Sequence, residues 1–91
     1  MPDDPKQTLL NRLNELREAL SHEPLSGTVT KARHHCDRLE QALSLAHAEG
    51  LRFAAFTLLK LFDPASAPHS EAILQARERL KAALEAGGFP H

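Results

Sequence analysis

The longest regular apolar pattern of the chain lies in residues 28–49, TVTKARHHCDRLEQALSLAHAE. Its apolar side chains recur every three or four residues, which places them on one face of an α-helix. This face is made of Val29, Ala32, Cys36, Leu39, Leu43 and Ala46. Gly50 follows directly, and glycine commonly ends a helix. We therefore predict a helix over residues 28–49 with one apolar side.

Three further segments on either side of this helix show the same periodicity. Asp4 can cap a helix that starts at the next residue, and Ser66 or Ser70 can cap another. Gly87 and Gly88 then end the last segment. The corresponding helices are predicted over residues 5–20, 51–62 and 70–86.

The composition agrees with an all-α protein. Leucine and alanine dominate the 42% of hydrophobic residues, whereas tryptophan and tyrosine are absent and β-branched apolar residues are almost so. Helices favour the first group and strands the second. Short connections between the helices indicate an antiparallel four-helix bundle. We expect one domain over residues 1–91, with frayed ends at residues 1–4 and 87–91.

The segment 51–62 is more apolar than one side of a surface helix requires. Arg52, Thr57 and Lys60 occupy an arc of about 140°, which leaves about 220° apolar, whereas a surface helix needs little more than about 100°. Either this helix is central in the bundle, wrapped by the other three, or its second face meets another molecule; we expect it to be the central helix. The candidate interface residues are Phe53, Phe56, Leu59 and Leu61.

Protein–protein interaction is the function that this surplus favours, because aromatic anchors dominate interface energetics. We expect a small adaptor, chaperone-like partner or regulator that self-associates as a homodimer through the third helix.

An alternative is anion or nucleic-acid binding through a basic stripe on the second helix. Lys31, His34, His35 and Arg38 follow helical spacing and share one side of it. Such a site would bind more weakly as salt rises and more tightly as pH falls.

A second alternative is a metal- or redox-responsive bundle that uses Cys36 and nearby histidines. His34, His35 and Cys36 are consecutive, however, so on a helix they diverge by about 100° each and cannot chelate one ion together. We expect no metal site within the chain, and Cys36 is expected to fill the core as a small hydrophobe.

The net charge and the absence of known catalytic motifs argue against several other functions. Eleven basic and twelve acidic residues give a net charge of −1, so no strong field points to a nucleic acid or a membrane. The chain shows neither a glycine-rich phosphate loop nor a serine-nucleophile motif, and we expect no enzyme, cofactor or small-molecule substrate. The N-terminus does not resemble a signal peptide, and a cytoplasmic protein is expected.

Overall fold

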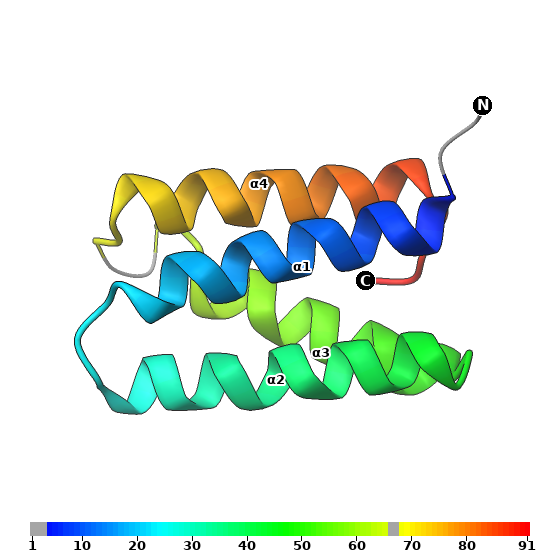
Figure 1. The fold of residues 1–91 in the computed structure, drawn as a ribbon, viewed down its shortest axis with the longest axis horizontal. Helices are drawn as coiled ribbons and strands as arrows, with labels where there is room; N and C mark the ends of the chain where they lie inside the picture. Colours follow the sequence, from blue (N-terminus) through cyan, green and yellow to red (C-terminus); the bar gives the residue numbers. More distant parts are fainter. Residues whose placement is uncertain (1–3, 66–67) are drawn as a thin grey trace.

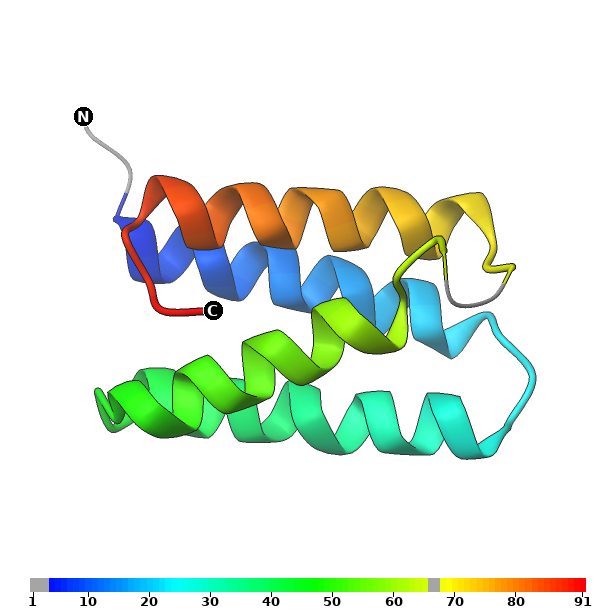
Figure 2. The ribbon, with the colours of Figure 1, turned by 180° about the vertical axis from the view of Figure 1, so that it is seen from behind.

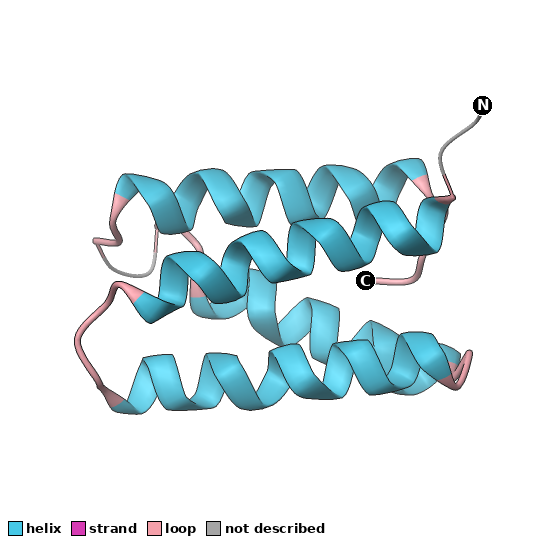
Figure 3. Ribbon diagram, viewed as in Figure 1, coloured by secondary structure: helices cyan, strands magenta, loops and turns pink. Residues whose placement is uncertain are grey.

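The computed structural model describes residues 4–65 and 68–91, which form four α-helices and no strand (Figure 1, Figure 3). The helices are α1 (Pro5–Ser21), α2 (Gly27–Ser44), α3 (Ala48–Leu61) and α4 (Glu71–Ala86). Each helix runs opposite to the one before it in the chain (Figure 1). The predicted all-α antiparallel four-helix bundle is thereby confirmed.

The bundle is built from two close helix pairs, α1 with α4 and α2 with α3, and α1 also contacts α2. Seen from behind, α3 runs obliquely from the level of α2 toward α4 (Figure 2). Among the other described helices, only α2 lies close to the backbone of α3 over much of its length. The expectation that the third helix would lie at the centre of the bundle is therefore wrong: α3 has one side on the core and one side open.

The core is made of leucines and small residues from all four helices. Leucine keeps most of its side-chain freedom in a helix, and alanine lets neighbouring backbones approach closely. The largest fully buried side chains are Leu9, Leu13, Leu16, Leu20, Leu39, Leu58, Ile73, Leu80, Leu84 and Cys36. The predicted apolar faces of the first, second and fourth helices supply most of them.

Side-chain caps set where the helices begin. Asp4 accepts a hydrogen bond from the backbone N–H of Lys6 at 3.0 Å. Ser70 caps α4 by accepting from the N–H of Ile73 at 3.3 Å, as predicted; the alternative cap, Ser66, lies outside the described residues. Each of these caps satisfies one amide that the first turn leaves unpaired.

The second helix is shorter than predicted, because α2 ends at Ser44 instead of continuing to residue 49. Ala46 adopts a left-handed conformation with φ of 53°. The N–H of His47 then donates to the carbonyl of Ala42 at 2.9 Å, and the N–H of Ala46 donates to the carbonyl of Leu43 at 3.3 Å. These two bonds form a Schellman motif, which usually has glycine at the left-handed position.

The third helix consequently starts at Ala48, three residues earlier than predicted. His47 caps it, since its Nδ1 accepts from the N–H of Gly50 at 2.9 Å. A Cβ on residue 50 would come within 2.9 Å of that same Nδ1. Gly50 is therefore needed for close approach inside the first turn of α3 and does not end α2.

The C-terminal end of α4 repeats the same motif with glycine in place of alanine. Gly88 has φ of 69°, and the N–H of Phe89 donates to the carbonyl of Leu84 at 2.9 Å. Phe89 is half-buried against the core. The tail that the sequence predicts to fray at residues 87–91 begins with this cap, and residues 1–3 at the other end lie outside the described residues.

Among the described helices, none has the length and apolar character that a bilayer span requires.

Candidate functional site: the outer face of α3

Two phenylalanines lie on the side of α3 that faces away from the core. Phe53 is 57% exposed and Phe56 is 54% exposed, whereas Leu51 and Leu58 on the opposite side are buried. A spacing of three residues places the two aromatic side chains on the same helix face. Large neighbouring apolar groups that remain exposed commonly mark a binding surface.

The other two predicted interface residues are placed differently. Leu59 and Leu61 are half-buried and pack against the core cluster. The carbonyl of Leu59 also accepts a hydrogen bond from Nε of Arg77 at 2.9 Å, which ties this edge of α3 to α4. The structure therefore brings Phe53 and Phe56 together on the open face and turns Leu59 and Leu61 toward the bundle.

Charged residues stand at both ends of the aromatic pair. Nζ of Lys60 lies 5.7 Å from the centroid of the Phe56 ring, within cation–π range. At the other end, Oε2 of Glu49 is 3.3 Å from a guanidinium nitrogen of Arg52. We call Glu49, Phe53, Phe56 and Lys60 the outer stripe of α3; these residues follow one another at intervals of four, three and four.

A groove between α2 and α3 borders the outer stripe at Phe53. Its volume is about 300 Å³, and its rim includes Leu45, which is 68% exposed. The remaining lining residues are Arg38, Gln41, Ala42, His47 and Gly50. The sequence analysis missed Leu45 because it predicted that α2 continues through the turn at Ala46. Apolar periodicity does not show that a helix ends at an alanine, so it could not place Leu45 on the surface.

His35, a member of the predicted basic stripe, is buried and only 6% exposed. Its ring centroid lies 6.0 Å from that of Phe53 and 5.7 Å from that of His34. Burial lowers its pKa, and the nearby charges of His34, Arg38 and Lys31 lower it further. Its Nδ1 has no hydrogen-bond partner among the described residues. The imidazole of His35 therefore packs against Phe53 in its neutral form, and its burial keeps it from contacting an anion in solvent.

The rest of the basic stripe is exposed beside the groove. Lys31, His34 and Arg38 all face solvent on α2, and Arg38 lines the α2–α3 groove. Arg38 in this groove and Lys60 over the ring of Phe56 therefore place positive charge beside both aromatic side chains, although the whole chain carries −1.

Cys36 lies on the buried side of α2 and has no exposed surface. Burial raises its pKa to about 12, so the side chain stays a thiol at neutral pH. A thiolate is the form that attacks electrophiles and binds metals. Within residues 4–65 and 68–91, no three His, Cys, Asp or Glu side chains gather into a group that could hold an ion.

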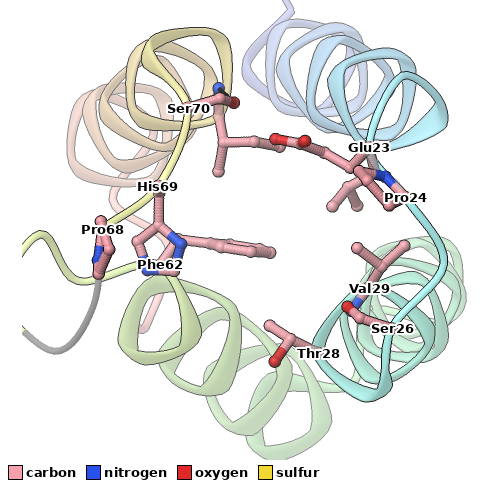
Figure 4. A pocket seen from close by; sticks show the side chains of 11 residues that line it. Glu23, Pro24, Ser26, Thr28, Val29, Phe62, Pro68, His69 and Ser70 are labelled. Atoms are coloured by element: carbon pink, nitrogen blue, oxygen red, sulfur yellow. Dashed lines mark hydrogen bonds between the residues drawn. The ribbon is translucent and has the colours of Figure 1, made fainter.

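A second pocket opens at the end of the bundle where the α1–α2 and α3–α4 loops meet, with a volume of about 400 Å³. Glu23 and Pro24 lie on one side of it, and Phe62 and His69 lie on the other (Figure 4). The two rings are edge-to-face at 5.4 Å. Nε2 of His69 is buried without a partner in the described chain. Sequence reasoning missed this pocket because its lining comes from the ends of all four helices.

The open side of α3 is therefore distinguished by two adjacent aromatic rings, by a groove beside them, by Lys60 at one end and by the carboxylate of Glu49, paired with Arg52, at the other. The end pocket offers one histidine and one glutamate among mainly apolar and hydroxyl side chains. Comparison of the chain with family models, with curated proteins and with solved structures finds no match.

Proposed function

We propose that this chain is a small helical protein-interaction module whose binding surface is the outer face of α3. The observation that carries the proposal is the exposure of Phe53 and Phe56 on one face of a helix whose opposite face already completes the core. Aromatic residues of this kind are typical anchors of protein interfaces.

The energy available at this surface is sufficient for an anchor. A phenylalanine that becomes fully buried covers about 150–250 Å², and each of these two rings still exposes somewhat more than half of its surface. Covering about 100 Å² on each ring yields about 5 kcal/mol for the pair at 25 cal/mol per Å². Part of that gain is consumed by the loss of translational and rotational freedom on association.

The alternative of anion or nucleic-acid binding would rely on Lys31, His34 and Arg38, because His35 is buried beneath Phe53. It predicts an affinity for oligonucleotides that falls steeply with salt. The metal or redox alternative would rely on Cys36, whose raised pKa and burial oppose both chemistries. A protein interface at the aromatic face needs neither a basic site nor a reactive thiol. It is also consistent with the lowered pKa of His35, which favours the neutral imidazole beside Phe53.

Site-specific photo-crosslinking tests the proposal. A photoreactive phenylalanine analogue is placed at residue 56, and a control chain carries the same analogue at Glu85, an exposed residue of α4. In living cells, residue 56 should crosslink to one defined polypeptide, identified by mass spectrometry, while residue 85 should not. Replacing Phe53 by serine should remove the adduct and leave the helical circular dichroism spectrum unchanged.

Equal labelling from residues 56 and 85 would contradict the proposal, because it would mean that the face of α3 contacts nothing specifically. An adduct that survives Phe53→Ser would also contradict it, since the two rings form one surface. Oligonucleotide binding that is lost on Lys31→Gln but retained in Phe56→Ser would favour the anion-binding alternative.

A further inference from the structure

We infer that the partner of the outer stripe is a second copy of this chain, bound antiparallel along α3. The inference rests on the proposed function and adds an occupant and a register to it. In the dimer, Phe53 of each copy lies against Phe56 of the other, and Glu49 of each copy lies against Lys60 of the other.

The spacing of the outer stripe carries this inference. The midpoint between Phe53 and Phe56 is also the midpoint between Glu49 and Lys60. When a two-fold axis passes through that point, Phe53 of each copy faces Phe56 of the other. The same axis places the Glu49 carboxylate of each copy opposite the Lys60 ammonium of the other. The intervals of four, three and four residues repeat at heptad period, which is the pattern of a helix–helix seam.

Charge selects the antiparallel arrangement over the parallel one. Glu49 and Lys60 are both exposed and stand eleven residues apart, about 16 Å along the helix. A parallel pair would place Glu49 against Glu49 and Lys60 against Lys60, whereas the antiparallel pair places opposite charges together at both ends. An isologous two-fold contact requires this kind of self-complementarity.

The buried area sets the strength of the dimer. Four half-exposed rings supply about 400 Å² of aromatic surface, and stable interfaces bury about 1,200–2,000 Å² in total. The α2–α3 groove beside Phe53, with its volume of about 300 Å³ and its exposed Leu45, offers further surface to the ring of Phe56 from the other copy. We therefore expect a reversible dimer with micromolar or weaker affinity.

Charge exchange on the full chain tests the register. Sedimentation equilibrium of the unaltered protein, from micromolar to millimolar concentration, should show a monomer–dimer equilibrium. Glu49→Lys and Lys60→Glu should each weaken it by about tenfold, because each replaces two attractive contacts per dimer with two repulsive ones. An equimolar mixture of the two variants should recover dimer, since one copy then carries only positive charge at positions 49 and 60 and the other carries only negative charge there.

A matched control keeps the test specific. Glu85 is an exposed residue of α4, and Glu85→Lys changes the net charge by the same amount as Glu49→Lys. Because residue 85 lies outside the outer stripe, this variant should leave association unchanged. Circular dichroism and thermal melting show whether each variant is folded. Phe56→Ser, which removes the central ring contact, should weaken the dimer by more than either charge change.

Three results would overturn the inference. If the unaltered chain dimerises but the mixture of variants does not, the register is wrong. If the unaltered chain stays monomeric throughout the range, a second copy is not the occupant; a residue-56 crosslink to another protein would then leave the proposed function standing. If poly-glutamate binds in a Phe56-dependent and salt-sensitive manner to a monomer, the occupant is an acidic partner.

Discussion

Replacing Ala46 by glycine should stabilise the protein, because this alanine holds a backbone conformation that favours glycine. Its φ of 53° lies in the left-handed region, where a residue with a Cβ loses about 1–2 kcal/mol relative to the right-handed helix. Glycine avoids most of that strain, but its greater freedom in the unfolded chain takes back about 0.4–1 kcal/mol. The expected net gain is about 0.5–1 kcal/mol, or about 2–8 °C in Tm for a domain of this size.

The same chain contains the opposite experiment at the end of α4. Gly88 occupies the equivalent position of the second Schellman motif with φ of 69°, and a Cβ added there would meet nothing within 4 Å. Gly88→Ala should therefore destabilise the protein by a similar amount through backbone strain alone. Urea unfolding followed by circular dichroism measures both variants. A loss of stability in Ala46→Gly would refute the reasoning, as would shifts of the same sign in the two variants.

The remaining predictions concern three side chains inside the bundle. His35→Leu should raise stability by about 1 kcal/mol, since it removes an unpartnered buried nitrogen. Because burial lowers the pKa of His35, the unfolded chain binds the extra proton, and the unaltered protein should lose stability as pH falls below about 6.5. Melting from pH 7.5 to about 5 should show that His35→Leu loses this part of the pH dependence. His34→Gln should keep the larger share of it, which burial causes. Arg77→Met should cost about 1–3 kcal/mol by urea titration, because the 13% exposed side chain would no longer bond the carbonyl of Leu59; an unchanged midpoint would mean that water replaces the bond. Cys36 should react with Ellman's reagent no faster than the protein unfolds, since its pKa is raised to about 12; a fast reaction in native buffer would revive the redox alternative.

The helices were predictable because periodicity and caps act locally. The apolar face of α1, the Asp4 and Ser70 caps and the glycine end of α4 all follow from residues a few positions apart. The α2–α3 boundary was not predictable in the same way. Glycine at residue 50 signals a helix end, yet the chain turns four residues earlier by placing Ala46 in the left-handed region. The local preference of alanine does not predict this conformation, which lets α3 fold back onto α2.

The candidate site was predictable only in part, since burial depends on the side from which neighbours approach. The sequence shows that residues 51–62 carry more apolar surface than one face needs, but it does not show which part α4 covers. In the structure the Leu59 edge lies toward α4, where Arg77 bonds its carbonyl, and Phe53 and Phe56 lie outside. The burial of His35 has the same origin, because it results from Phe53 packing across from α3.

The position of α3 at the side of the bundle strengthens the argument for a partner. A central helix would use all of its apolar arc within one chain, and no surplus would remain. Here the core is completed by the buried residues Leu51, Ala54, Ala55 and Leu58, so the fold needs no aromatic ring at position 56, and at position 53 it needs only a side chain that covers His35. Lysine or glutamine at both positions would serve the bundle equally well, because the methylene groups of a long polar side chain also cover apolar surface. Two phenylalanines with opposite charges at mirrored distances are instead what an antiparallel contact between two copies requires.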